Sequence, residues 1–162
     1  MASKRLFTTR KVRYSDFEKV FSLEKKIFGE SDRFSKRQIQ YLLSSKNACF
    51  RLCYAGKHCV GYGINLISRL RNGKLKGRVY SIGILPTYRG QGAGSILLRA
   101  MERDLAQSSV SFITLETKKG GKGAATFFRQ HGYRVVEDLP MYYASGAGLR
   151  MCKNLRRLKK KD

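Results

Sequence analysis

The sequence predicts an α/β protein with a mixed, mostly antiparallel β-sheet flanked by about four helices. The chain has 162 residues, of which 42% are hydrophobic, and this is enough to close one compact core. Segments with strand and helix patterns alternate along its second half, and short turns between apolar segments predict antiparallel hairpins. We expect a single domain over 1–155 and a solvated basic tail, RRLKKKD, over 156–162.

The first third of the chain predicts a strand and two helices, over 6–14, 16–28 and 35–45. Ser15 or Asp16 can cap the first helix, whose apolar residues recur at helical spacing. Ser35 is the natural N-cap of the second helix, because a glutamine follows it three residues later, as in a capping box.

The middle of the chain predicts three strands, over 48–55, 58–69 and 79–85. The first two are joined by Ala55-Gly56-Lys57, a short connection typical of a hairpin. Asn72-Gly73 provides a further turn before the third strand. That strand is expected to stop at Pro86, because proline cannot donate to a sheet.

Helices and strands then alternate to the end of the chain. We expect helices over 93–107 and from Ala124 to Gly132, and strands over 110–117, 133–136 and 148–154. The strand over 110–117 is apolar on both faces, which indicates a central position in the sheet.

The formal net charge of +23 is the most unusual global property of the chain. From Arg33 to Met101 there are thirteen Lys or Arg residues and no Asp or Glu. Such a positive field attracts polyanions, so coenzyme A, acidic peptides, and RNA or the ribosome are candidate partners. A general role of the charge in solubility is the alternative.

Other classes of protein have little support. No apolar segment is long enough for a membrane span, and we expect a cytoplasmic protein. The start, MASKRLFTTRKVRY, also has the composition of an organelle transit peptide, although the same residues make a plausible first strand. The four cysteines and two histidines have no metal-site spacing, so we expect reduced structural thiols and no metal.

A glycine-rich segment, Arg89-Gly90-Gln91-Gly92-Ala93-Gly94, lies between an expected strand and an expected helix. Glycines let the backbone turn its N–H groups inward, and a helix N-terminus adds roughly half a positive charge. The segment therefore predicts a site for a pyrophosphate, with Arg89 as an additional charge. It lacks the Lys-Ser/Thr of a Walker motif and the spacing of a dinucleotide-binding loop.

The glycine-rich segment matches the R/Q-x-x-G-x-G/A signature of the GNAT acetyltransferases, and the chain resembles this family over about 6–155. Leu115-Glu116-Thr117, the helix from Ala124 to Tyr133 and the Tyr142-Tyr143-Ala144-Ser145-Gly146 segment resemble later elements of the family. The resemblance implies a twisted sheet with a splayed cofactor cleft between two central strands. It also implies acetyl-CoA as cosubstrate and acetyl transfer to a primary amine.

Among GNAT members, the Leu-Glu-Thr and Tyr-Tyr-x-x-Gly patterns look closest to protein N-terminal acetyltransferases, including the ribosomal-protein alanine N-acetyltransferases. The acceptor is then the N-terminal amine, or a lysine, of a protein or peptide. The resemblance places backbone groups near Ile84 on the pantetheine arm and Phe128 beside the cofactor. It assigns the pyrophosphate to the main chain of Arg89, Gly90, Gln91, Gly92, Ala93, Gly94 and Ser95.

The resemblance implies Glu116 as the general base, and Glu116 is the only carboxylate between Asp104 and Glu137. The alternative is a structural carboxylate paired with a neighbour such as Lys118 or Lys119.

Tyr142 and Tyr143 correspond to acceptor-site tyrosines of relatives, or they cover a sheet edge. Phe128 stands where relatives usually have a tyrosine that protonates the coenzyme A sulfur, and Gly121 stands where asparagine is common. Tyr142, Tyr143 or a water would then supply that proton.

A second hypothesis comes from a different class of protein. A catalytically weak domain of the same fold could bind RNA, the ribosome or a protein partner through its basic surface, which is consistent with Phe128 and with the tail.

Overall fold

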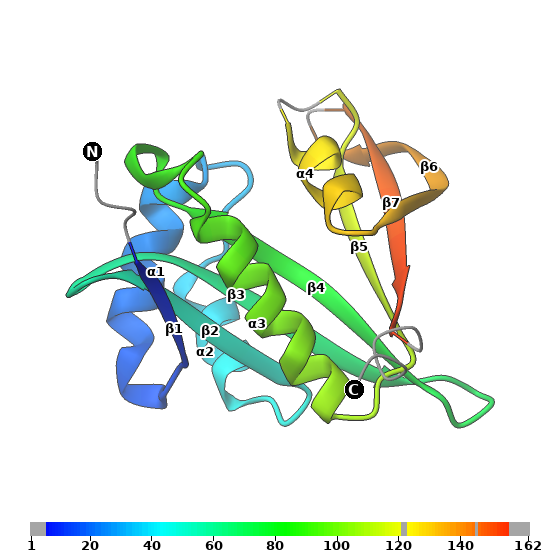
Figure 1. The fold of residues 1–162 in the computed structure, drawn as a ribbon, viewed down its shortest axis with the longest axis horizontal. Coiled ribbons are helices and arrows are strands. Elements are labelled where there is room, and N and C mark those ends of the chain that lie inside the picture. The colour runs from blue at the N-terminus through cyan, green and yellow to red at the C-terminus, as the bar shows by residue number, and fades with distance from the viewer. Residues whose placement is uncertain (1–5, 121–122, 145, 156–162) are drawn as a thin grey trace. The chain divides into compact units, whose positions relative to one another are not determined.

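The computed structural model of the protein describes residues 6–120, 123–144 and 146–155 (Figure 1). The predicted basic tail over 156–162 and Gly121 therefore lie outside the described residues. The elements, in chain order, are β1 (Phe7–Lys11), the short 3₁₀ helix η1 (Tyr14–Asp16), α1 (Phe17–Ile27), α2 (Lys36–Ser44), β2 (Ala48–Ala55), β3 (His58–Arg69), β4 (Leu75–Ile84), the 3₁₀ helix η2 (Pro86–Tyr88), α3 (Ala93–Gln107), β5 (Phe112–Lys118), α4 (Ala124–Gln130), β6 (Arg134–Tyr143) and β7 (Gly146–Asn154).

The strands form one sheet in the order β1-β2-β3-β4-β5-β7-β6. β4 and β5 pair in parallel, whereas β1 with β2, β2 with β3, β5 with β7, and β6 with β7 pair antiparallel. This confirms the predicted mixed, mostly antiparallel sheet with four helices. β5 has a neighbour on each side, as its apolar faces predicted. It pairs with β7 over its full length and with β4 through Phe112–Thr114.

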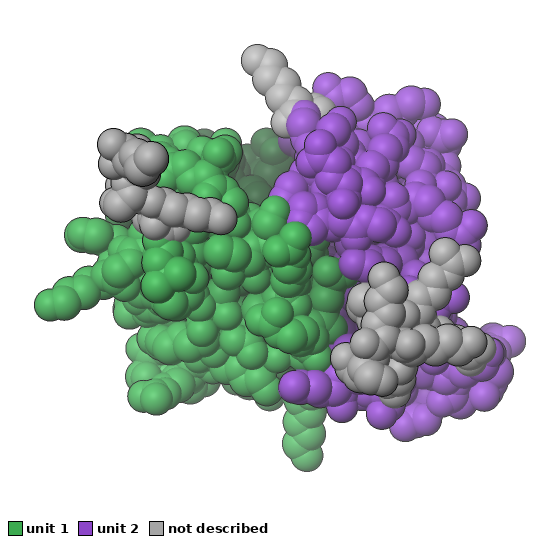
Figure 2. Space-filling model, in the orientation of Figure 1, with its two compact units in different colours: residues 1–66, 81–104 green, residues 67–80, 105–162 purple. Residues whose placement is uncertain are grey.

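The chain divides into two compact units (Figure 2). The first unit comprises residues 1–66 and 81–104, and the second comprises residues 67–80 and 105–162. β3 and β4 each contribute residues to both units.

The first unit packs α3 closely against the sheet. Leu97, Leu98 and Met101 on one side of α3 are at most 1% exposed. A Cβ at Gly63 of β3 would overlap the Met101 thioether, so glycine lets the helix approach the strand. The side-chain amide of Asn65 donates to the Met101 carbonyl at 2.9 Å and fixes the same contact.

The second unit has its own core. Ile113 and Leu115 of β5, with Met151 of β7, are at most 1% exposed. On the opposite face of β5, Thr114 is 5% exposed and the Glu116 side chain is 7% exposed, so both faces of this strand are covered. A Cβ at Gly77 would lie only 3.0 Å from Leu105 and Val110, so this glycine also permits close packing.

Several predicted element boundaries are confirmed. β2, β3 and α3 have the predicted residues. Ser35 caps α2 in a capping box, because the Gln38 N–H donates to Ser35 Oγ at 3.2 Å and the Ser35 N–H donates to Gln38 Oε1 at 2.8 Å. The helix after Gly123 ends before Gly132, whose φ of +90° is the left-handed conformation that glycine accepts.

The first strand and the first helix are shorter than predicted. β1 ends at Lys11 because the Asp16 carboxylate accepts the Arg13 N–H at 2.8 Å and closes a 3₁₀ turn. Asp16 also binds the Arg10 guanidinium through two 2.8 Å hydrogen bonds instead of capping α1 with its side chain.

β4 and β6 are longer than predicted. β4 begins at Leu75, directly after the Asn72-Gly73 turn. β6 runs past residue 136 and contains Pro140. This strand lies at the sheet edge, where a missing N–H is tolerated, and its register shifts between Leu139 and Tyr143, where Met141 has a φ of +57°.

Candidate functional site

The glycine-rich segment of the first unit forms a turn between η2 and α3. Gly90 and Gly92 have φ values of +72° and +94°, which L side chains rarely adopt. A Cβ at either position would meet no atom within 4 Å, so the backbone conformation, and not crowding, requires glycine.

Two side chains attach this turn to the preceding residues. Arg89 Nε donates to the Ile84 carbonyl at 2.9 Å, and Gln91 Nε2 donates to the Thr87 carbonyl at 3.0 Å. Arg89, which the sequence assigned to the phosphate as a charge, is therefore also an anchor that holds the turn at the end of β4.

α3 begins with its N–H groups at this turn. The hydrogen bond from the Ile96 N–H to the Gly92 carbonyl, at 3.2 Å, is of the helical i to i−4 type, and the amides of Ala93 and Gly94 precede it. The helix has fifteen residues, so its N-terminus carries the full effect of the aligned peptide dipoles. Left-handed glycines, an anchored arginine and a helix N-terminus together fit a pyrophosphate group.

Glu116 of the second unit lies between two arginines. Its side chain is 7% exposed, and its two oxygens accept Arg78 Nε at 2.9 Å and Arg150 Nε at 3.3 Å. Arg150 is directly opposite Glu116 in the β5–β7 register. The hydrogen bond with Glu116 is also the main reason why the pKa of Arg150 is raised.

Glu116 is paired with cations, as the structural alternative expected, but its partners are Arg78 and Arg150 and not Lys118 or Lys119. Lys119 Nζ pairs with Asp138 Oδ1 at 3.0 Å, and Lys118 Nζ lies 5.8 Å from the centre of the Tyr143 ring. Residues directly opposite on neighbouring strands lie closer than residues two apart on one strand, and this favours Arg150.

Arg78 connects Glu116 to the tyrosine pair. Its Nη2 donates to the Tyr142 hydroxyl at 3.2 Å, and the Tyr142 and Tyr143 rings stack edge to face at 4.9 Å. Tyr142 is 43% exposed. Glu116 and Tyr142 are thus both hydrogen-bonded to Arg78 and belong to one polar network.

Arg150 extends this network to Glu137, with which its Nη1 is hydrogen-bonded. Sequence reasoning missed both arginines. Arg78 ends a basic stretch, RLRNGKLKGR, that has the composition of a solvated loop, and no local pattern marks Arg150. Only the strand register brings them to Glu116.

Phe128 is packed in the second unit. It is 6% exposed and stacks edge to face on Phe127 at 5.2 Å and on Tyr133 at 5.7 Å. His131, directly after α4, has its Nδ1 2.7 Å from the Phe127 carbonyl oxygen.

Ile84 through Ser95 belong to the first unit, and Glu116, Phe128, Tyr142 and Tyr143 belong to the second. Within 6–120, 123–144 and 146–155, no group of three or more His, Cys, Asp or Glu side chains could hold a metal, and the four cysteines are free thiols. In the same part of the chain, no helix is long and apolar enough to cross a bilayer.

The chain is similar in sequence and in fold to known acetyltransferases. The model of the Acetyltransferase (GNAT) family matches residues 15–133. The N-alpha-acetyltransferase RimI of Mycobacterium tuberculosis is 30% identical over 135 residues, which are 82% of each chain. The uncharacterized N-acetyltransferase YjcF of Bacillus subtilis is 30% identical over 101 residues, 62% of this chain and 66% of that protein. The crystal structure of the Escherichia coli ribosomal-protein-S18-alanine N-acetyltransferase superposes with a TM-score of 0.77 at 14% identity, covering 92% of this chain and 94% of that one.

The chain belongs to the acetyltransferase (GNAT) family. It is an acetyl-CoA-dependent N-acetyltransferase, which confirms the predicted class of enzyme and the predicted cosubstrate.

Proposed function

We propose that the protein acetylates the N-terminal amine of a protein or peptide, and that a lysine amine is the alternative acceptor. The observation that carries this proposal is the network in which one arginine joins Glu116 to Tyr142, since it offers a base and a hydroxyl at one place. Relatives named for N-alpha-acetylation and for acetylation of a ribosomal-protein alanine support this choice of acceptor.

The glycine-rich turn is the proposed site for the cofactor. The main chain from Arg89 to Ser95 would hold the pyrophosphate, and backbone groups near Ile84 would hold the pantetheine arm. The Arg89 bond to the Ile84 carbonyl supports this assignment, because it links the two regions in one rigid turn. Acetyl-CoA supplies a thioester carbonyl that a neutral amine can attack.

Glu116 is the proposed general base. Each of its oxygens accepts one arginine N–H, and a carboxylate oxygen has a second lone pair that can accept the amine proton directly or through a water. The two arginines would hold the carboxylate in a fixed orientation, which general-base catalysis requires.

Tyr142 is the proposed acid for the leaving group, with Tyr143 or a water as alternatives. As the new N–C bond forms and the C–S bond breaks, the departing sulfur needs a proton, and Phe128 has no hydroxyl to give one. The Tyr142 hydroxyl accepts a hydrogen bond from Arg78, so its own proton remains able to point toward another acceptor.

We also propose that the enzyme acts in the cytoplasm and that its basic surface brings it to RNA or the ribosome. The net charge of +23 and the acid-free stretch from Arg33 to Met101 support this association, since they produce a field that concentrates polyanions.

The acceptor is tested by incubating the full chain with acetyl-CoA and pairs of peptides, and by measuring thiol release and peptide mass. Each pair has the same internal lysine and differs only in a free or blocked N-terminus. We expect release and a gain of one acetyl group with the free N-terminus alone. Equal acetylation of both members would assign the reaction to lysine, and cofactor binding without release on any peptide would rule out the proposed reaction.

A further inference from the structure

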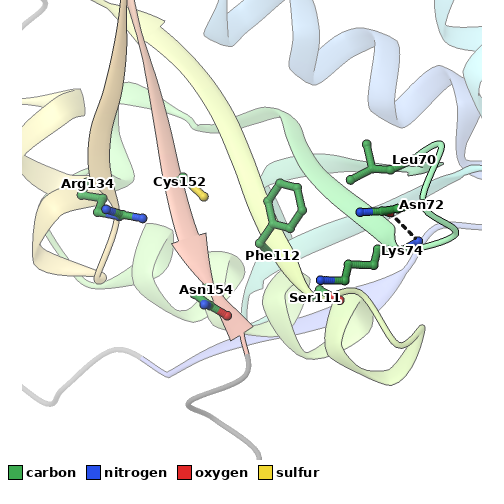
Figure 3. Close-up of a pocket in the computed structure, with 8 residues that line it drawn as sticks. All are labelled: Leu70, Asn72, Lys74, Ser111, Phe112, Arg134, Cys152 and Asn154. Atoms are coloured by element: carbon green, nitrogen blue, oxygen red, sulfur yellow. Dashed lines mark hydrogen bonds between the residues drawn. The ribbon is translucent and has the colours of Figure 1, made fainter.

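A hollow of about 330 Å³ lies in the second unit, near the start of β5 (Figure 3). It is lined by Leu70, Asn72, Lys74, Ser111, Phe112, Arg134, Cys152 and Asn154. Its volume falls within the roughly 300–1,000 Å³ of pockets for small ligands. Phe112 is four residues before Glu116, or about 13 Å along the strand, so the hollow is separate from the proposed catalytic network.

Backbone hydrogen bonds build the walls of the hollow. The Ser111 N–H donates to the Leu75 carbonyl at 3.1 Å, and the Ser111 carbonyl accepts the Leu155 N–H at 3.1 Å. The turn from Leu70 to Lys74 is closed by the Leu70 N–H on the Lys74 carbonyl at 2.8 Å and by the Lys74 N–H on Asn72 Oδ1 at 3.0 Å. These bonds fix the main chain that carries the lining residues Ser111, Asn72 and Lys74.

The hollow is positively charged. Its lining includes Lys74 and Arg134 and no carboxylate. In the described part of the second unit, all three carboxylates bind other cations: Glu116 binds Arg78 and Arg150, Glu137 binds Arg150, and Asp138 binds Lys119.

The pKa of the Cys152 thiol is affected by positive charges near the hollow. Burial is the main influence on its pKa and raises it, whereas the charges of Arg134 and Lys76 oppose that rise. Lys76 is opposite Phe112 in the β4–β5 register, and Arg134 is opposite Cys152 in the β6–β7 register. Lys74 and Arg134 thus line the hollow, and Lys76 adds a third positive charge near it on β4.

The lining of the hollow also includes an aromatic ring, that of Phe112. Figure 3 shows the half-buried Phe112 ring between Cys152 and the turn that carries Leu70 and Asn72. Asn154 is opposite Phe112 in the β5–β7 register and adds an amide to the lining. An aromatic face, an amide and cations are the groups with which proteins bind unpaired nucleotides: the base stacks, the amide reads its edge, and the cations bind phosphate.

We propose that this hollow binds one nucleotide of a single-stranded RNA, with the base on Phe112 and the adjoining phosphate between Lys74 and Arg134. An acidic peptide would satisfy the cations and leave the aromatic ring unused, so the lining favours a nucleotide. This contact would direct the enzyme to RNA-containing assemblies, and it does not depend on the proposed acceptor or on Glu116.

The test is a fluorescence anisotropy titration of the full chain with 5′-labelled oligouridine twelve nucleotides long. The variant Lys74→Glu/Arg134→Glu changes two exposed side chains. The control variant Lys46→Glu/Arg103→Glu makes the same change in net charge at two exposed positions of the first unit. We expect binding at least tenfold weaker in the first variant and less than threefold weaker in the control.

Two further measurements address the mode of binding. The slope of log affinity against log salt should decrease by about 0.7 in the first variant, as expected for the loss of one phosphate contact to a single strand. Phe112→Leu keeps an apolar side chain without a ring, and we expect about fivefold weaker binding with an unchanged melting temperature. Thiol release by Lys74→Glu/Arg134→Glu with a short peptide acceptor should equal that of the wild type.

Three results would overturn the proposal. Equal weakening in the control variant would show that net charge alone binds RNA. Competition by a twelve-residue glutamate peptide as strong as that of unlabelled oligouridine would assign the hollow to acidic peptides. Equal affinity of Phe112→Leu and the wild type for the oligonucleotide would show that the nucleotide base does not stack on Phe112.

Discussion

The two units of the molecule use their charged side chains differently. In the first unit, ion pairs connect one element to another: Arg51 Nη2 of β2 binds Asp104 Oδ1 of α3 at 2.8 Å, and Arg10 of β1 binds Asp16 of η1 at 2.8 Å. In the second unit, one carboxylate receives two arginines, and one of these arginines also binds an exposed tyrosine. Arg10 also donates to the Tyr54 hydroxyl at 3.0 Å, so an arginine joins a carboxylate to a tyrosine in both units, and the carboxylate shared by two arginines is what distinguishes the second.

The units also differ in how they would recognise their ligands. The glycine-rich turn of the first unit would bind phosphate with main-chain groups, which the local sequence determines. The network of the second unit is made of side chains from β4, β5, β6 and β7. This difference predicts that neutralising a paired carboxylate lowers the free energy of unfolding in the first unit and lowers the rate of acetyl transfer in the second.

Glu116→Gln should have the largest effect on turnover. We expect acetyl transfer to fall by about 100-fold or more, because a general base typically contributes 10²–10⁴ in rate. Acetyl-CoA affinity, measured by calorimetry, should stay within about twofold. Glu137→Gln is the matched control, since it removes another partner of Arg150 at an exposed position. Similar thiol release by the two variants would remove Glu116 from its proposed role.

Asp104→Asn should show the opposite behaviour. Arg51 and Asp104 have side chains that are 19% and 7% exposed, so the variant leaves a poorly hydrated guanidinium without its counter-charge. We expect a loss of about 2 kcal/mol in the free energy of unfolding, or roughly 6 °C in melting temperature, by calorimetry.

Turnover per folded Asp104→Asn molecule should match the wild type. Glu18→Gln, at an exposed position of α1, produces the same change in net charge and controls for it. If Asp104→Asn lowered the rate while leaving the melting temperature unchanged, the proposed division between the two units would be wrong.

The sequence predicted the parts of the molecule that depend on local patterns. The capping box of Ser35, the hairpin around Gly56 and the left-handed glycines of the turn before α3 each follow from residues close together in the chain. Their energetics are decided by backbone conformation and by nearest neighbours, so a single sequence contains the necessary information.

The partners of Glu116 could not be predicted in the same way. Arg78 and Arg150 are 38 and 34 residues from Glu116, and strand register alone places them there. The length of β6 was missed for a related reason. The strand predicted over 133–136 continues to Tyr143, and whether a strand lies at the edge, where Pro140 is tolerated, depends on the whole topology.

Tyr142→Phe and Tyr143→Phe compare two adjacent rings of which Tyr142 is the one bonded to Arg78. We expect about tenfold lower kcat for Tyr142→Phe and about twofold for Tyr143→Phe, measured by thiol release under saturating acetyl-CoA. A loss in Tyr142→Phe should be largest with acetyl-CoA and smaller with an acyl donor whose leaving group needs no proton. The reverse order of the two variants would assign the leaving-group acid to Tyr143.

Phe128→Tyr should have the smallest effect and would restore a hydroxyl at the position where the family resemblance expects one. Phe128 is 6% exposed and packed on Phe127 and Tyr133, so the added oxygen has little room and we expect about 1 kcal/mol of destabilisation. If the leaving-group proton comes from Tyr142, kcat should change by less than about threefold in Phe128→Tyr alone. The double variant Phe128→Tyr/Tyr142→Phe should then recover part of the rate lost in Tyr142→Phe, because the new hydroxyl would replace the missing one. No recovery, with the double variant folded by circular dichroism, would show that residue 128 does not reach the leaving group in this protein.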